Sequence, residues 1–126
     1  MPVAEQRPIL IVDDDEPTQK LLEALMKRQG LATRIVSNGA EAIDCLREEG
    51  EFACVILDLM MPSADGRAVI HHLANGGRRV PVIVCTAAGV RSTDGLDSGV
   101  VRAIVRKPFD IDELAAIVTA VASNQT

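Results

Sequence analysis

Five short apolar segments, each followed by polar residues, constrain the fold of this chain most strongly. Most of them are rich in Ile, Val and Leu along their whole length, which is typical of strands buried on both faces of a sheet. The predicted strands are 8–12, 32–36, 54–57, 80–85 and 103–106. Because segments with a helical spacing of apolar residues lie between these strands, the alternation predicts a parallel sheet covered by helices on both faces.

The predicted helices have recognisable ends. Pro17 suits the first turn of a helix, and Gly30 is a typical residue at which that helix ends. The last helix is predicted to begin at a cap provided by Asp110 or Asp112. The apolar stripe of the first helix is formed by Leu21, Leu22, Leu25 and Met26.

Segment 87–99 breaks the regular pattern. The alternation of strands and helices requires a fourth helix here, but the segment contains three Gly, two Ser and one Thr. These residues are poor helix formers. The sequence therefore predicts a short or irregular fourth helix.

The composition indicates one ordinary globular domain. A length of 126 residues fits a single domain, 1–126, with loose ends at 1–7 and 123–126. The net charge of −5 and the absence of Trp and Tyr argue against direct nucleic-acid binding. No apolar run approaches the length of a membrane span and no signal peptide precedes the first strand, so we expect a cytoplasmic protein without membrane insertion. The cysteines lack metal-like spacing and are predicted to be reduced core residues: Cys45, Cys54 and Cys85.

Polar side chains follow all five predicted strands at the points where the strands end. Because the carboxyl ends of parallel strands meet at one edge of a sheet, we expect these side chains to converge there. Alone, each has an ordinary explanation, since acids favour a helix start and a lysine before a proline is commonly a surface residue. Their joint placement favours a functional interpretation. The set comprises Asp13, Asp14, Asp15, Ser37, Asp58, Thr86 and Lys107.

The chemistry of this set points to phosphoryl transfer. Crowded carboxylates repel one another unless a cation joins them, and Mg²⁺ fits best because it accepts carboxylate oxygens and leaves positions for water and phosphate oxygens. Lys107 adds a compact positive charge and Thr86 a hydroxyl donor. An aspartate placed beside them can attack phosphorus in line and retain the phosphoryl group as an acyl phosphate.

With these motifs in this order, the sequence resembles the receiver domain of two-component response regulators over nearly its whole length. The resemblance implies an α/β fold with an open, doubly wound, five-stranded parallel sheet in the order 2-1-3-4-5. It also implies a phosphoacceptor and not a turnover enzyme. The motifs that carry it are Ile-Val-Asp-Asp at 11–14, Asp-Leu-Met-Met-Pro-Ser-Ala-Asp-Gly at 58–66, Thr-Ala at 86–87 and Lys-Pro-Phe at 107–109.

The resemblance assigns a role to each site residue. Asp58 is the implied phosphoacceptor. Asp14 would bind Mg²⁺ directly, together with Asp58 and the main-chain carbonyl of Met60, and Asp13 would assist, directly or through water. Mn²⁺ would be able to replace Mg²⁺.

The phosphoryl oxygens would be held by Thr86, with the adjoining Ala87, and by Lys107. The resemblance implies a histidine kinase or a histidine phosphotransfer protein as the donor. It also implies a downstream protein that binds the surface at 87–109, and a homodimer formed through the same surface.

One position departs from the family pattern. Three residues before the lysine, where receiver domains usually have an aromatic residue, this chain has Ile104. Isoleucine has no large ring to swing inward. We therefore expect an atypical switch, in which phosphorylation orders or moves segment 87–99.

Three alternatives remain open at this point. The chain could be a receiver-like docking module that acts without phosphate, which Ile104 would suit. It could be a phosphatase of the haloacid dehalogenase type, for which Asp13 and Asp15 fit the first-strand motif and Pro17 does not. It could also be a flavodoxin-like flavin carrier, although four acids after the first strand would repel a phosphate.

Overall fold

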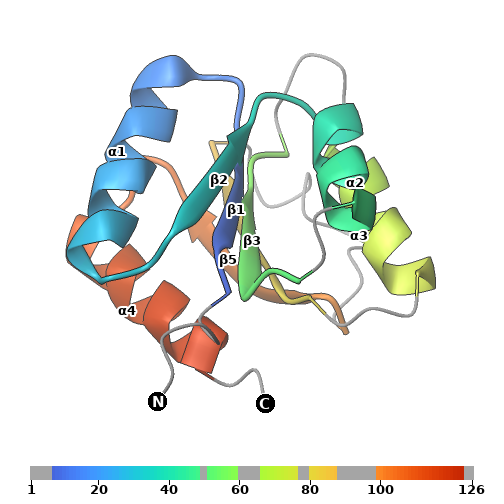
Figure 1. Ribbon diagram of the computed structural model, residues 1–126. Helices are drawn as coiled ribbons and strands as arrows, with labels where there is room; N and C mark the ends of the chain where they lie inside the picture. Colours follow the sequence, from blue (N-terminus) through green and yellow to red (C-terminus); the bar gives the residue numbers. More distant parts are fainter. Residues whose placement is uncertain (1–6, 49–50, 60–65, 77–79, 88–98, 124–126) are drawn as a thin grey trace.

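The structure is a computed structural model that describes residues 7–48, 51–59, 66–76, 80–87 and 99–123 (Figure 1). Strands and helices alternate along most of this part of the chain, as the sequence predicts. In chain order the elements are β1 (Ile9–Val12), α1 (Glu16–Arg28), β2 (Thr33–Val36), α2 (Gly39–Glu48), β3 (Cys54–Leu57), α3 (Gly66–Asn75), β4 (Val82–Thr86), β5 (Val101–Arg106) and α4 (Ile111–Ser123).

The strands form one parallel sheet in the order β2-β1-β3-β4-β5. This is the predicted strand order. Val12, the last residue of β1, pairs with Val36 of β2 on one side and with Leu57 of β3 on the other. The carboxyl ends of these three strands are therefore level with one another, and the residues that follow them lie at the same edge of the sheet.

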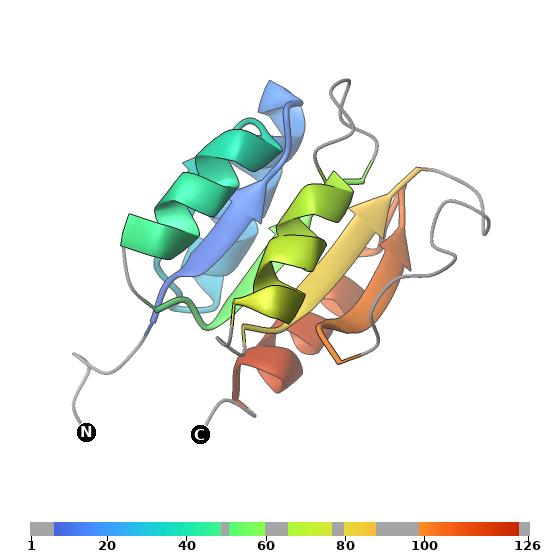
Figure 2. The ribbon, with the colours of Figure 1, turned by 90° about the vertical axis from the view of Figure 1, so that its right-hand side faces the viewer.

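Helices cover both faces of the sheet, which confirms the predicted layering. Helices α1 and α4 lie on one face and α2 and α3 on the other (Figure 1). Figure 2 shows α2 and α3 in front of the sheet, with α4 behind it. Because both faces are covered, β1 and β3 are buried along their whole length.

The core consists of two apolar layers that share the sheet. Leu10 and Val12 of β1 belong to the layer under α2 and α3, whereas Ile9 and Ile11 belong to the layer under α1 and α4. All four side chains are completely buried. Burying each such side chain contributes about 1.5–3 kcal/mol to the free energy of folding. The buried central strand therefore keeps the polar residues that follow it in fixed positions.

Three helix starts are fixed by side-chain caps. Asp15 accepts a hydrogen bond from the main-chain N–H of Thr18 at 3.1 Å and caps α1. Asn38 accepts from the N–H of Glu41 at 2.8 Å at the start of α2. The cap of α4 is Asp110, the first of the two predicted candidates, which accepts from the N–H of Glu113 at 3.0 Å.

The end of α1 also agrees with the sequence, but its apolar stripe is narrower than predicted. Gly30 follows the helix with a φ of 75°, a conformation that favours glycine. Leu21 is 41% exposed, whereas Leu22, Leu25 and Met26 are buried. Leu21 therefore lies at the border of the stripe and outside the core.

Two strand boundaries differ from the predicted ones. The fourth strand begins at Val82, after Pro81, and extends through Thr86. The fifth begins at Val101 because the register shifts between Val82 and Ile83, whose partners are Val101 and Ala103. The strand therefore includes Val101 and Arg102, which the predicted strand 103–106 did not. No local sequence signal marks the register shift.

Other expectations concern residues that are described only in part. The predicted irregular helix at 87–99 lies outside the described residues except for Ala87 and Gly99. Of the predicted loose ends, Arg7 forms an ion pair with Glu51 at 3.1 Å, and Ser123 ends α4. The three cysteines are buried and carry free thiols, as predicted. None of the helices in the described ranges is long and apolar enough to cross a membrane.

Candidate phosphoryl and metal site

Two buried aspartates lie side by side at the carboxyl edge of the sheet. Asp13 directly follows β1 and Asp58 directly follows β3. The N–H of Asp58 donates to the carbonyl of Val12 at 3.0 Å, and the N–H of Asp13 donates to the carbonyl of Val36 at 3.2 Å. These bonds extend the parallel ladder to the two acids, which are only 2% and 6% exposed. The strand register thus brings together two carboxylates 45 residues apart in the sequence (58 − 13).

The glycine of the Asp-x₇-Gly motif fits closely against the same strand end. Gly66 begins α3, and a Cβ at this position would lie 3.0 Å from the Cα of Leu59 and 3.1 Å from the carbonyl oxygen of Asp58. A side chain would therefore push the helix away from Asp58 and Leu59 at the end of β3. Residues 60–65 between them lie outside the described part of the chain.

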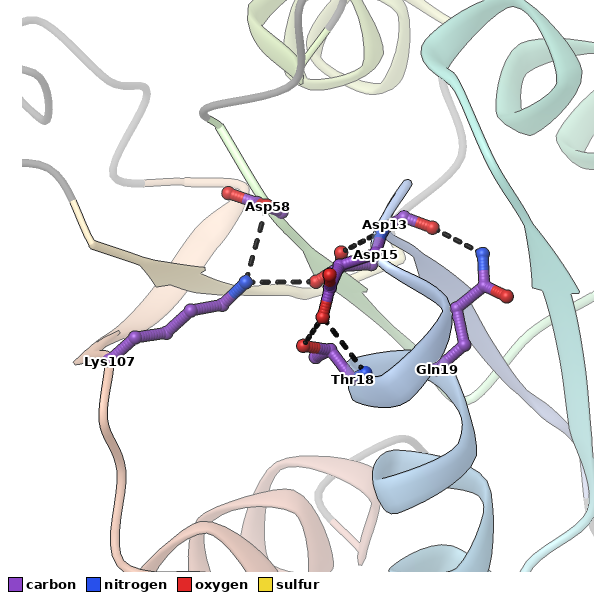
Figure 3. A network of polar contacts seen from close by, with 6 residues as sticks. All are labelled: Asp13, Asp15, Thr18, Gln19, Asp58 and Lys107. Atoms are coloured by element: carbon purple, nitrogen blue, oxygen red, sulfur yellow. Dashed lines mark hydrogen bonds and ion pairs between the residues drawn. The ribbon is translucent and has the colours of Figure 1, made fainter.

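Lys107 joins the two buried aspartates. Its Nζ lies 3.0 Å from Oδ2 of Asp13 and 3.2 Å from Oδ2 of Asp58 (Figure 3). The lysine follows β5 directly, and its main-chain N–H donates to the carbonyl of Thr86 at 3.0 Å. The structure therefore brings Lys107 into contact with residues that follow two distant strands, as the sequence predicts.

Burial and charge shift the pKa values of this group in definite directions. Burial raises the pKa of Asp13 above its ordinary value, although hydrogen bonds from the N–H of Asp15 and from Lys107 oppose it. Burial lowers the pKa of Lys107, but the carboxylates of Asp13 and Asp58 outweigh that effect and raise it overall. The carboxylates thus stabilise the ammonium group, while Asp13 remains a costly buried anion.

Asp13 has a contact at each carboxylate oxygen. Its Oδ1 accepts a hydrogen bond from the N–H of Asp15 at 2.9 Å, and its Oδ2 accepts from Lys107. Asp15 itself caps α1, and hydrogen bonds from Thr18 lower its pKa. The third acid of the run is therefore a helix cap that also orients Asp13.

Three carboxylates lie close enough to hold one divalent cation. Oxygen atoms of Asp13, Asp14 and Asp58 all lie within 4.8 Å of one another. Asp13 and Asp58 are buried, whereas Asp14 is exposed. A set of oxygen donors with excess negative charge suits Mg²⁺, so these residues fit the predicted metal. Met60, whose carbonyl the sequence adds to the ligand set, lies outside the described residues.

The predicted switch residues occupy the neighbouring strands. Thr86 is the last residue of β4 and is 1% exposed, and Ala87 is an exposed residue in the bend that follows. Ile104 of β5 is 47% exposed. Thr86 therefore lies at the edge that bears Lys107, whereas Ile104 lies further back along β5 with its side chain partly in solvent.

Sequence reasoning missed one residue of this site, Gln19. Its Nε2 donates to the main-chain carbonyl of Asp13 (Figure 3). The same nitrogen lies 3.2 Å from Oγ of Ser37, a member of the predicted polar set. Gln19 is on α1, one turn after the cap. A single glutamine on a helix carries no recognisable signal, because the contact depends on how α1 turns back over the end of β1.

Comparison with known proteins identifies the family. The family model described as response regulator receiver domain matches residues 9–119. The transcriptional regulatory protein SrrA of Staphylococcus aureus is 38% identical over 114 residues, which are 89% of this chain and 46% of that protein. The chain spans about half the length of the curated relatives it matches.

Two solved structures are similar to this chain in both fold and sequence. A response regulator receiver protein from Burkholderia phymatum is 36% identical, with a TM-score of 0.77 and coverage of 93% of this chain and 96% of that one. The response regulator protein TrrA from Thermotoga maritima, solved in complex with Mg(2+)-BeF, is 28% identical, with a TM-score of 0.81 and coverage of 92% and 99%. The matched segment contains all the predicted site residues, from Asp13 to Lys107. The chain belongs to the family of response regulator receiver domains.

Proposed function

We propose that this receiver domain accepts a phosphoryl group on Asp58 in a Mg²⁺-dependent reaction. The proposed donor is a histidine kinase or a histidine phosphotransfer protein. The observation that carries the proposal is the position of Lys107 Nζ, 3.0 Å from Asp13 and 3.2 Å from Asp58. A cation beside the acceptor carboxylate can stabilise the charge of an incoming phosphoryl group.

The proposed chemistry is a direct transfer between donor and acceptor. A carboxylate oxygen of Asp58 attacks phosphorus, and the phosphorus–nitrogen bond to the donor imidazole breaks. The electron pair of that bond stays on the ring nitrogen, so a ring protonated at its other nitrogen leaves as neutral imidazole. The product on this chain is an acyl phosphate on Asp58.

Several residues around Asp58 would support this step. Lys107 would move its charge from Oδ2 of Asp58 toward the phosphoryl oxygens, and Thr86 would donate its hydroxyl to one of them. Asp14 and Asp58 would hold the metal with the carbonyl of Met60, while Asp13, with a contact at each carboxylate oxygen, would assist. When bound, Mg²⁺ would neutralise phosphoryl charge, and Mn²⁺ with its similar ligand preference would replace it.

We further propose that the chain acts as one receiver domain whose output is a change of binding partner. The surface at 87–109 would bind a downstream protein or a second copy of the chain. The exposure of Ile104 supports this because a side chain on that surface is available for contact. The domain would serve as a phosphoacceptor without catalytic turnover.

The test is the intact mass of the protein after incubation with acetyl phosphate and Mg²⁺, with Asp58→Asn as the matched variant. We expect one added phosphoryl group on the wild type and none on the variant. Labelling of both proteins would place the acceptor elsewhere. Labelling of neither, by acetyl phosphate or by a phosphorylated donor protein, would favour a docking module that acts without phosphate.

A further inference from the structure

The peptide group between Asp13 and Asp14 is held by a side chain from α1. Nε2 of Gln19 donates to the carbonyl oxygen of Asp13, six residues earlier in the sequence (Figure 3). The same nitrogen lies 3.2 Å from Oγ of Ser37, at the end of β2. Gln19 therefore links the first turn of α1 to the ends of two neighbouring strands.

This contact acts on the peptide unit that carries Asp14. The carbonyl of Asp13 and the N–H of Asp14 belong to one planar group. When Gln19 fixes the oxygen of that group, it limits rotation about the bonds on either side. The other end of the turn is held by Asp15, whose N–H bonds to Asp13 and whose carboxylate caps α1.

Asp14 depends on this main-chain restraint more than its neighbours do. Asp13 and Asp58 are buried and both contact Lys107. The carboxylate of Asp14 is exposed, and within the described part of the chain no hydrogen bond or ion pair orients it. Its position within 4.8 Å of the other two carboxylates is thus set by the main chain on which it stands.

We propose that Gln19 is a positioning residue for the divalent-cation site: it fixes the Asp13–Asp14 peptide and so directs the Asp14 carboxylate toward the metal. This inference rests on the metal-binding part of the proposed function. A ligand that is already directed loses less conformational freedom when the cation binds. Gln19 therefore increases affinity for the metal without touching it.

The test is Mg²⁺ binding to the unphosphorylated protein, measured by titration calorimetry. Gln19→Met removes the amide donor and keeps the length of the side chain and the helix propensity. We expect Gln19→Met to bind Mg²⁺ about 3- to 10-fold more weakly, the effect of one lost hydrogen bond. The control Gln29→Met, at the exposed C-terminal end of α1, should match the wild type.

A second readout separates positioning from general damage to the fold. The rate of labelling by acetyl phosphate should fall in Gln19→Met at low Mg²⁺ and return to the wild-type rate at saturating Mg²⁺. The thermal midpoint without metal shows that the variant is folded. Equal Mg²⁺ affinity in Gln19→Met and wild type would overturn the inference, as would a labelling defect that saturating Mg²⁺ does not relieve or an equal loss of affinity in Gln29→Met.

These results also distinguish the inference from the proposed function. A wild-type protein that binds Mg²⁺ and is labelled on Asp58, beside a Gln19→Met variant of unchanged affinity, would overturn the role of Gln19 alone. A wild-type protein that does not bind Mg²⁺ would overturn both.

Discussion

Ile104 of β5 lies opposite Val84 of β4 in the sheet register, yet Ile104 is 47% exposed while Val84 is completely buried. The two side chains are neighbours on adjacent strands, but β4 is interior to the sheet and β5 is an edge strand. Ile104 therefore contributes little to the core, and its side chain is available to a partner.

This difference predicts unequal costs for the two alanine substitutions. Val84→Ala should lower the free energy of unfolding by about 2 kcal/mol, since it removes two buried carbon atoms and leaves a cavity. Ile104→Ala should cost less than about 1 kcal/mol, because half of that surface is already in water. Urea unfolding of both variants measures this, and equal losses would contradict the burial difference.

Lys107 is predicted to stabilise the protein by neutralising buried charge. Lys107→Met keeps most of the apolar stem but leaves the carboxylates of Asp13 and Asp58 without their shared cation. We expect a loss of about 1–3 kcal/mol at neutral pH without metal.

Added Mg²⁺ should then raise the unfolding midpoint of Lys107→Met more than that of the wild type, because the lysine no longer competes for the carboxylates. Thermal unfolding with and without Mg²⁺ tests both statements. A variant as stable as the wild type in metal-free buffer would show that the ion pairs contribute nothing.

The buried thiols predict a loss of stability at alkaline pH. Burial raises the pKa of Cys54 and of Cys85 to about 12, whereas a thiol in an unfolded chain titrates near 8.5. Between these values the unfolded state has released the proton and the folded state has not, so stability falls as the pH rises. Each thiol should contribute a slope of about 1.4 kcal/mol per pH unit.

Cys54→Ala provides the test of this slope. The variant should be less stable than the wild type at neutral pH, because a buried side chain is shortened. Its stability should fall less steeply above about pH 8.5. Urea unfolding in reducing buffer across this range measures both slopes, and parallel slopes would refute the thiol explanation.

The cap formed by Asp15 should make the stability of the protein fall as the pH is lowered into the acid range. Hydrogen bonds from Thr18 hold the pKa of Asp15 below its ordinary value, so its contribution is present above the unfolded pKa and is lost as the pH falls through the folded one. Asp15→Ala should lower the thermal midpoint at neutral pH by removing the α1 cap. The difference from the wild type should shrink in acid, and Asp15→Asn, which retains a capping oxygen, should lie between the two.

The residues that could be predicted from the sequence are those whose place follows from strand register. Asp13 and Asp58 come directly after buried strands, and parallel pairing alone makes them neighbours. Lys107 follows the last strand in the same way. The cap of α4 was also predictable, because an Asp directly before a helical stripe can accept a hydrogen bond from the first turn of the helix.

The residues that could not be predicted depend on three-dimensional detail. The contact of Gln19 requires the angle at which α1 turns back over β1, and periodicity does not encode that angle. The early start of β5 follows from a register shift beside Val82, which no residue type marks. Leu21 fits the helical spacing as well as Leu22 does, but the width of the buried stripe is set by the packing of α1.

The carboxylates and the ammonium group of the site follow strands that differ in burial. The carboxylates of Asp13 and Asp58 follow β1 and β3, which are buried along their whole length, whereas Lys107 follows β5, where only Val105 is buried. Amide protons in β1 and β3 should therefore exchange slowly, while those of β5 exchange through smaller local openings. If Asp58 is phosphorylated as proposed, we therefore expect Asp13 and Asp58 to keep their positions and Lys107, at the end of the less buried edge strand, to move.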